Sequence, residues 1–333
     1  MIQKAGLFRK ASVLLGAGAL AWMALAPSVH AQSPAYPDKP VRWVVPFPAG
    51  GGLDSVSRVV AAEMAALLGQ PVVVDNRVGA GGTIGAASVA SSPADGYTLM
   101  SLDSGSYTTS HLFYTKLNYN AVRDFKLVGT MVRLPVVLAV PANSPLKTYQ
   151  DFVAFAKANP GKGNYASPGL GTPQHTGMEL LQSRTGLKLQ HIPYKAMSAI
   201  LTDLSTGQVD VAFSDYGSAK SFLDGGRIRL LAVATERRLP VQPNVPTFDE
   251  LGVKSLPVSM WHSFVVPGKT PDAVVERLST VLNTALQSPK MKAQVDASSS
   301  QVFFKNGREG AAYVNEQAAM WAPIVKGLNI QLD

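Results

Sequence analysis

From residue 41 onward, short apolar runs alternate with glycine-rich turns and helical patterns, and this alternation strongly limits the possible folds. Val41–Phe47 is an apolar, β-branched run typical of a buried strand, and Gly50, Gly51 and Gly52 follow it. Asp54 then stands where the N-cap of a helix is expected. The helix itself is indicated by apolar residues at helical spacing, namely Val56, Val59, Val60, Met64, Leu67 and Leu68. Repeated strand, loop and helix patterns predict an α/β fold with a mostly parallel sheet.

The later elements form two such series. Further strands are predicted at 71–74, 97–102, 136–140, 164–167, 189–194, 209–213, 230–234 and 260–266. Further helices are predicted at 83–90, 149–158, 197–204, 274–286 and 311–325, and one is predicted to begin at Thr172-Pro173. The chain after about residue 257 is too short for a third domain, so we expect it to pack onto the first series. The predicted division is lobe 1 at 32–140 plus 258–333, and lobe 2 at 141–257.

Residues 1–31 have the pattern of a secretory signal peptide. Lys4, Arg9 and Lys10 form a basic start, an uncharged stretch of 16 residues follows, and small residues end at Ala31. The stretch is shorter than the roughly 20 residues that a membrane-spanning helix needs. We therefore expect cleavage near Ala31 and a mature protein that is secreted and soluble.

Composition excludes several classes of protein. Hydrophobic residues make up 46% of the 333 residues and charged residues 16%, a balance that intrinsically disordered chains do not have. The absence of cysteine excludes disulfides, thiolate catalysis and cysteine–metal sites. The net charge of +8 is scattered, and three of the basic residues lie in the predicted signal peptide. We therefore expect no nucleic-acid partner.

The common enzyme motifs fail when their spacing is checked. No Lys and Ser/Thr follow the first glycine loop, as a P-loop requires. The dinucleotide fingerprint fails at its third position, which is Ser55, although Asp75 stands where a ribose-binding acid would. The histidines have no metal-ligand spacing. We predict no cofactor, no metal and no catalysis, and a nicotinamide-dependent oxidoreductase remains an alternative.

The first glycine loop is instead suited to an anion. A strand, a glycine turn and a helix start present free backbone N–H groups and the positive end of a helix dipole. The same arrangement recurs at Gly169–Thr172 in the second series. Two such loops on opposing lobes would form a cleft that holds a small dicarboxylate or a similar acid; the alternative is that each loop is simply a tight turn between a strand and a helix.

Polar residues that follow strands are further candidates. Asp103 and Ser104 follow the third strand, Tyr194 ends a later one, and Asp215 follows Phe213. His175 lies in the first turn of the helix after Gly171. Each has a structural alternative: a surface position for His175, a core ring for Tyr194, and helix capping for the two aspartates.

The chain resembles the Bug family of TctC-like periplasmic receptors of tripartite tricarboxylate transporters. The resemblance extends over 36–333, and the motifs that carry it are 36–41 (YPDKPV), 45–54 (VPFPAGGGLD), 76–82 (NRVGAGG), 95–99 (DGYTL), 164–167 (NYAS), 193–195 (PYK) and 321–326 (WAPIVK). It implies a type II periplasmic-binding-protein fold: two α/β lobes with mixed sheets, joined by two crossing segments and closing around a ligand. It also implies transfer of the ligand to membrane permease subunits, and we expect a monomer.

The resemblance also indicates which residues hold a carboxylate. The loop at 47–52 corresponds to the first-lobe segment that holds the carboxylate in this family. The segment from Ser167 through His175 corresponds to the second-lobe segment of the binding site. The predicted ligand-binding residues are Phe47, Ala49, Gly51, Gly52, Asp103, Ser104, Ser167, Gly169, Gly171, Thr172, His175, Tyr194 and Asp215.

The sequence departs from the family pattern near this site. Ala196 stands where glycine is usual, Ser214-Asp215-Tyr216 replaces an Asp-Asn-Leu-like run, and Asp103 replaces a small neutral residue. Two carboxylates would repel an acid ligand unless something neutralises them. We therefore hypothesise a ligand with a cationic or hydrogen-donating group beside its carboxylate, such as an amino acid or an amide. A sensor subunit that signals to a membrane kinase is an alternative to a transport receptor.

Overall fold

The computed structural model describes residues 36–114, 116–254, 256 and 258–328. The contacts divide the chain into Met1–Tyr36 and Pro37–Asp333, and the description below concerns the second unit. The predicted signal peptide, 1–31, lies outside the described residues. No described helix combines the length and the apolar character needed to cross a membrane.

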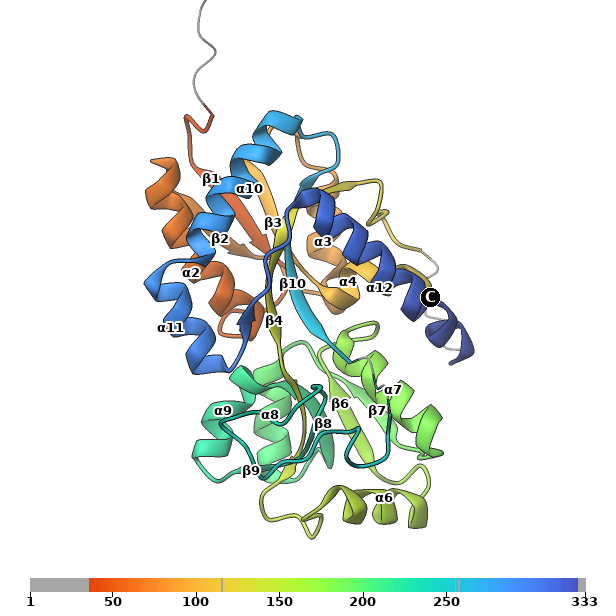
Figure 1. Ribbon diagram of the computed structural model, residues 1–333. Helices are drawn as coiled ribbons and strands as arrows, with labels where there is room; N and C mark the ends of the chain where they lie inside the picture. The colour runs from red at the N-terminus through yellow and green to blue at the C-terminus, as the bar shows by residue number, and fades with distance from the viewer. Residues whose placement is uncertain (1–35, 115, 255, 257, 329–333) are drawn as a thin grey trace, which may run out of the picture. The chain divides into compact units, whose positions relative to one another are not determined.

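Two mixed sheets organise this unit (Figure 1). The first has the order β11-β4-β10-β3-β1-β2 and the second β7-β6-β8-β5-β9. The strands of the first are β1 (Val41–Val45), β2 (Val72–Asn76), β3 (Thr98–Asp103), β4 (Phe125–Leu134), β10 (Met260–Pro267) and β11 (Gln301–Val302). The strands of the second are β5 (Val136–Pro141), β6 (Asn164–Ser167), β7 (Gln190–Pro193), β8 (Val211–Asp215) and β9 (Ile228–Val233).

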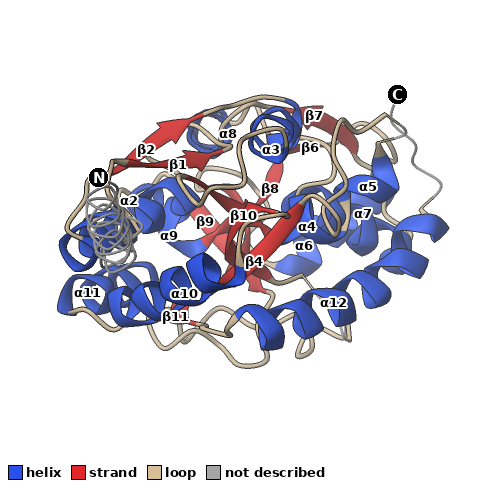
Figure 2. Ribbon diagram, turned by 90° about the horizontal axis from the view of Figure 1, so that it is seen from above, coloured by secondary structure: helices blue, strands red, loops and turns tan. Residues whose placement is uncertain are grey.

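Helices pack against both sheets, as Figure 2 shows in a second view. Those of the first series and the C-terminal part are α2 (Gly52–Leu68), η2 (Ala80–Gly82), α3 (Thr83–Ala90), α4 (Ser104–Thr108), α5 (Ser110–Phe113), α10 (Asp272–Leu286), α11 (Pro289–Ser298) and α12 (Gly307–Gly327). Those of the second series are α6 (Tyr149–Ala158), α7 (Pro173–Thr185), α8 (Met197–Thr206) and α9 (Tyr216–Asp224).

The predicted α/β class with two mixed sheets is confirmed, but the expectation of mostly parallel pairing is wrong. Strand β1 pairs in parallel with β2 and β3, whereas β10 enters between β3 and β4 and is antiparallel to both. In the second sheet β5 is antiparallel to β8 and β9. Both inserted strands arrive by a crossing from the other sheet rather than through a βαβ unit, so nothing forces them to be parallel.

The chain crosses between the sheets twice, as the predicted fold requires. It leaves the first sheet at Leu134 and enters the second at Val136, and it returns before Met260. Strand β5 belongs to the second sheet, although residues to 140 were assigned to the first lobe. We propose that the lobe boundary follows the sheets and lies near Pro135.

Each sheet has its own hydrophobic core. One buried cluster joins strands of the first sheet to α3, α4 and α12, and includes Val44, Met100 and Trp261. The other joins strands of the second sheet to α8 and α9, and includes Ala212, Ile200 and Ala219. Each sheet therefore anchors its own loops at the strand ends, where the two halves of the fold meet.

Candidate ligand-binding site

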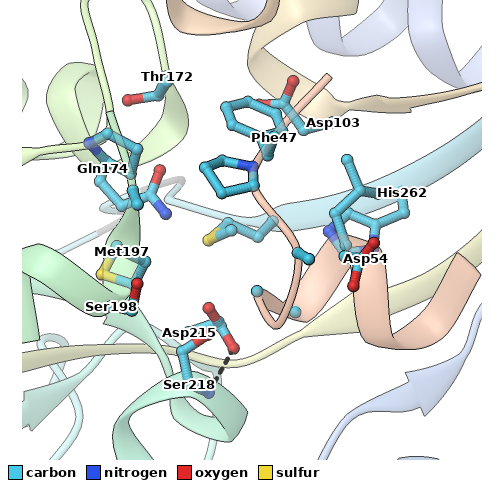
Figure 3. Close-up of a pocket in the computed structure, with 18 residues that line it drawn as sticks. Phe47, Asp54, Asp103, Thr172, Gln174, Met197, Ser198, Asp215, Ser218 and His262 are labelled. Carbon is cyan, nitrogen blue, oxygen red and sulfur yellow. Dashed lines mark hydrogen bonds between the residues drawn. The ribbon is translucent and has the colours of Figure 1, made fainter. Parts of the chain in front are cut away.

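A cavity of about 70 Å³ lies where loops from the two sheets face each other (Figure 3). Such a volume admits roughly five to seven waters, or one small organic molecule. The first half of the fold contributes Phe47, Pro48, Ala49, Gly51, Gly52, Leu53, Asp54, Asp103, Met260 and His262. The second half contributes Pro168, Thr172, Gln174, Ala196, Met197, Ser198, Asp215 and Ser218.

The structure brings seven of the predicted residues to the cavity wall. They are Phe47, Ala49, Gly51, Gly52, Asp103, Thr172 and Asp215. The other six are not among the lining residues: Ser104, Ser167, Gly169, Gly171, His175 and Tyr194. Most of these six hold the lining loops in place, as the following contacts show.

The start of α2 forms the first part of the wall. Its N-cap is Gly51, which has no side chain to satisfy the first N–H groups of the helix. The prediction that Asp54 is this N-cap is wrong, because the helix begins two residues earlier. Asp54 instead accepts hydrogen bonds from the Gly50 N–H (2.9 Å), Arg58 Nε (2.9 Å) and Asn76 Nδ2 (2.8 Å). These bonds hold the glycine loop against the helix and leave its N–H groups at the cavity.

Burial alone would raise the pKa of Asp54, but the bonds from Arg58, Gly50 and Asn76 outweigh it and leave the pKa lowered. Asn76 also donates to the Phe47 carbonyl (2.9 Å). A charged carboxylate therefore fixes the 47–50 loop at neutral pH.

The start of α7 forms the facing part of the wall. Thr172 is the N-cap and Pro173 the first helical residue, as predicted, and the Thr172 hydroxyl donates to the Gly169 carbonyl (2.7 Å) rather than capping the helix. Ser167 Oγ also donates to Gly169 (3.0 Å), and the Gly171 N–H donates to His175 Nδ1 (3.2 Å). The predicted residues behind this loop thus position it instead of lining the cavity.

Helix α8 supplies a third uncapped helix start. Its N-cap is Ala196, which has no capping side chain, and Met197 and Ser198 line the cavity beside it. Tyr194, two residues earlier, is half-buried against the second core, and its hydroxyl donates to Asp203 Oδ2 (2.5 Å). Tyr194 therefore packs against the core, which was the structural alternative to ligand binding for this residue.

Both predicted aspartates cap helices. Asp103 Oδ1 accepts from the Ser106 N–H (3.2 Å) at the start of α4, and Asp215 Oδ1 accepts from the Ser218 N–H (2.8 Å) at the start of α9 (Figure 3). Both side chains are buried and still line the cavity. Burial raises the pKa of each carboxyl, although the cap bonds oppose the rise. Capping and cavity lining are therefore combined in the same residues.

The cavity wall carries no lysine or arginine among its described residues. Its positive potential comes from the uncapped starts of α2, α7 and α8, each of which presents free N–H groups and a helix dipole. Its negative groups are Asp103, Asp215 and Asp54, the last paired with Arg58. The site can therefore hold an anionic oxygen at the helix starts and a hydrogen-donating group near the aspartates.

Eleven of the 18 lining residues were not among the predicted ligand-binding residues: Pro48, Leu53, Asp54, Pro168, Gln174, Ala196, Met197, Ser198, Ser218, Met260 and His262. Gln174 lies in the first turn of α7, where the argument used for His175 applied equally. His262 and Met260 lie in β10, and no local pattern marks a strand residue as lining a cavity. His262 pairs across the strands with Asp103, so only the sheet register brings it to the site.

Two histidines lie behind the second glycine loop, His175 buried and His191 half-buried. The His175 and His191 ring centroids are 4.6 Å apart, and His191 Nε2 lies 2.8 Å from Ser167 Oγ. Burial lowers the pKa of His175 to about 3, with a contribution from His191, and burial lowers the pKa of His191 to about 4. Both rings are therefore neutral near pH 7. The described residues contain no cluster of acidic or histidine side chains that could hold a metal ion.

The two halves also meet at glycines beside the cavity. Thr109 Oγ1 donates to the Gly171 carbonyl (3.1 Å), and a methyl group added at Gly105 would lie 2.6 Å from the same oxygen. A methyl group at Gly81 would lie 2.8 Å from the Leu170 carbonyl. Only residues without a side chain permit this approach.

Solved structures place this architecture among the periplasmic binding proteins. The structure of BugD is similar with a TM-score of 0.84 and 32% identity, and covers 89% of this chain and 99% of that one. An R. palustris protein solved with adipate has a TM-score of 0.85 and 31% identity, with 89% and 99% covered. MatC of Rhodopseudomonas palustris, solved with malate, has a TM-score of 0.82 and 29% identity, with 87% and 100% covered.

Residues 56–330 match the family described as tripartite tricarboxylate transporter family receptor, TctC. Protein BugT of Bordetella pertussis is 32% identical over 298 residues, covering 89% of this chain and 91% of that protein. A protein encoded in the tcbD-tcbE intergenic region of Pseudomonas sp. strain P51 is 39% identical over 256 residues, 77% of this chain and 76% of that protein. The chain therefore belongs to the TctC family of solute-binding receptors, and the predicted resemblance is confirmed.

Proposed function

We propose that this receptor captures one small carboxylate between the two halves of its fold and delivers it to the membrane subunits of a tripartite tricarboxylate-type transporter. We propose further that it binds without catalysis, works as a monomer in the periplasm, and loses residues 1–31 on export. The observation that carries the proposal is that three uncapped helix starts, from both halves, face a single cavity.

A carboxylate suits this arrangement because its oxygens accept hydrogen bonds from several backbone N–H groups without a cationic side chain. The adipate and malate of the two related structures are acids of this kind. Closure of the two halves around the carboxylate would stabilise the bound state through contacts that exist only when helix starts from both halves reach it. That mechanism links binding to a shape that membrane subunits can recognise.

The remaining polar groups of the cavity wall restrict the chemical class of the solute. Asp103 and Asp215 lie on the cavity wall, and neither has an ion-pair partner among the described residues. An amino or amide group on the solute would donate to them, whereas a second carboxylate would be repelled unless one aspartate is protonated. We propose that the solute carries a hydrogen-donating group beside its carboxylate.

The test is calorimetric titration of residues 32–333 with succinate, adipate, malate, aspartate, asparagine and NAD. We expect binding to at least one acid and none to NAD. In Asp103→Asn and Asp215→Asn, loss of a charged hydrogen bond should lower the affinity for aspartate or asparagine by roughly 10- to 150-fold relative to the affinity for succinate. Asp224→Asn removes the same charge from an exposed, lysine-paired site on α9 and is the matched control. An unchanged ratio would contradict the hydrogen-donating ligand, and binding to NAD alone would contradict the receptor function.

A further inference from the structure

Four buried side-chain atoms of the described residues have no hydrogen-bond partner, and two of them belong to the cavity wall. They are His262 Nδ1, on β10 of the first sheet, and Ser218 Oγ, in the first turn of α9. The other two, Arg133 Nε and Tyr149 Oη, belong to residues that do not line the cavity. Orphaned polar atoms thus gather at the site from both halves of the fold.

Leaving a buried polar atom unpaired is destabilising, so such atoms normally have a partner. His262 is only 1% exposed; Met260 and Phe264, which share its face of β10, are buried and apolar, and Asp103 lies opposite it on β3. Ser218 also differs from the other α9 serine, Ser221, which is exposed. A partner that arrives with the solute would account for both atoms.

We propose that His262 and Ser218 are specificity residues that bind a hydroxyl, amino or amide substituent of the solute, and so distinguish it from the plain carboxylate of the same length. This inference rests on the proposed carboxylate-binding function and adds the residues that read the substituent. His262 and Ser218 come from opposite halves of the fold, so they can hold the same substituent only when both halves surround it.

The chemistry of the two side chains fits a hydrogen-bonding substituent rather than a charge. Burial lowers the pKa of His262 to about 3, which leaves the ring neutral near pH 7, with one N–H donor and one nitrogen acceptor. The serine hydroxyl can also donate and accept. A hydroxyl or amino group has the same dual character, whereas a methylene group in its place would leave both residues unpaired.

The test compares matched solutes: succinate with malate, succinate with aspartate, and adipate with 2-aminoadipate. We expect the wild-type receptor to bind the substituted member of at least one pair more tightly. His262→Phe removes the ring nitrogens and keeps the aromatic volume, so affinity for that member should fall by roughly 5- to 100-fold while the plain acid changes less than about twofold. Ser218→Ala should act in the same direction.

His262→Asn is the rescue variant, because its amide places polar atoms near the position of Nδ1; it should restore much of the preference. Ser221→Ala, on the same helix, should leave every affinity unchanged. A second readout separates recognition from a structural role. The ligand-free His262→Phe protein should melt no lower than the wild type, since it loses an unpaired polar atom.

Three results would overturn the inference. One is an unaltered preference in His262→Phe and Ser218→Ala. Another is equal weakening of both members of a pair together with a lower melting temperature, which would show that Nδ1 is held by a structural water. The third is the absence of binding by the wild type to any of these acids; that result contradicts the proposed function itself, and this inference fails with it.

Discussion

The glycine contact between the two halves makes a quantitative prediction for Gly105→Ala. The added methyl group would lie 2.6 Å from the Gly171 carbonyl oxygen and 2.9 Å from Pro173 Cδ, both in the facing half of the fold. Ordinary van der Waals contact begins at 3.4 Å, so the two segments must separate by about 0.8 Å. Overpacking of this kind costs about 1–3 kcal/mol.

Under the proposed mechanism, in which the two halves close around the solute, the cost should fall on the ligand-bound state, because that state requires the halves to stay together. Affinity is then expected to drop by about 5- to 150-fold. The ligand-free protein should keep its stability, since its halves can separate and alanine favours the helix by up to about 1 kcal/mol. Gly327→Ala, at the end of α12 with nothing within 4 Å of the added methyl group, is the control.

The assay is calorimetry with whichever of succinate, adipate, malate and aspartate binds wild type most tightly, together with thermal unfolding without ligand. Small-angle scattering with and without that solute would report closure. The reasoning is refuted if Gly105→Ala binds as tightly as Gly327→Ala. It is equally refuted if the variant loses as much stability without ligand as with it, because the contact would then be permanent.

Three further predictions concern the residues that support the site. Asp54→Asn should lower the free energy of unfolding by about 1.5–3 kcal/mol, measured in urea, because the charged bonds to Arg58, Gly50 and Asn76 are weakened; no loss beyond that of Asp224→Asn would contradict this. Asp103→Ala should lower the free energy of unfolding by about 0.5–2 kcal/mol, whereas Asp103→Asn should lower it little, because asparagine keeps a capping oxygen for the Ser106 N–H. Equal losses in the two variants would exclude a capping role. Burial lowers the pKa of His175 and of His262 to about 3, whereas a histidine in the unfolded chain has a pKa of 6.5. The folded state is therefore fully stable with respect to these two groups above pH 6.5, and it loses stability as the pH falls toward 3. Each should contribute a slope of about 1.4 kcal/mol per pH unit in that window, and His175→Asn, which keeps an acceptor for Gly171, should reduce the slope measured by unfolding at pH 4–7.

Most of the strands could be predicted from local sequence, and there is a physical reason why the long strand β4 could not. The apolar runs at 41–47, 164–167 and 260–266 gave β1, β6 and β10. Strands β4 (Phe125–Leu134) and β11 were missed, as were α4, α5, α9 and α11. Gly129 and Thr130 interrupt the apolar pattern of β4, and they are accommodated because Leu282 of α10 and residues 303–305 pack on them. That packing is a long-range contact which no local window contains.

The glycine loops and the two aspartates were found from the sequence because each stands directly after a strand. In parallel strands the residues that follow share one edge of the sheet, so chain order is enough to bring Gly52 and Asp103 together. The same reasoning placed Thr172 and Asp215 on the second half. It could not separate Asp103, which lines the cavity, from Ser104, which donates to the Ser259 carbonyl instead.

The sequence by itself determined the α/β class, the family, the two glycine loops and the helix starts that follow them, because these depend on short-range periodicity, glycine and capping preferences. Only the tertiary structure decided that β5 joins the second sheet, that Asp54 braces a loop, and that His262 and Ser218 reach one cavity with no partner of their own. The register of β10 and the approach of the two halves bring these last residues together across large separations in the chain. Their presence at the same cavity depends on the packing of the whole molecule, and no local sequence pattern predicts it.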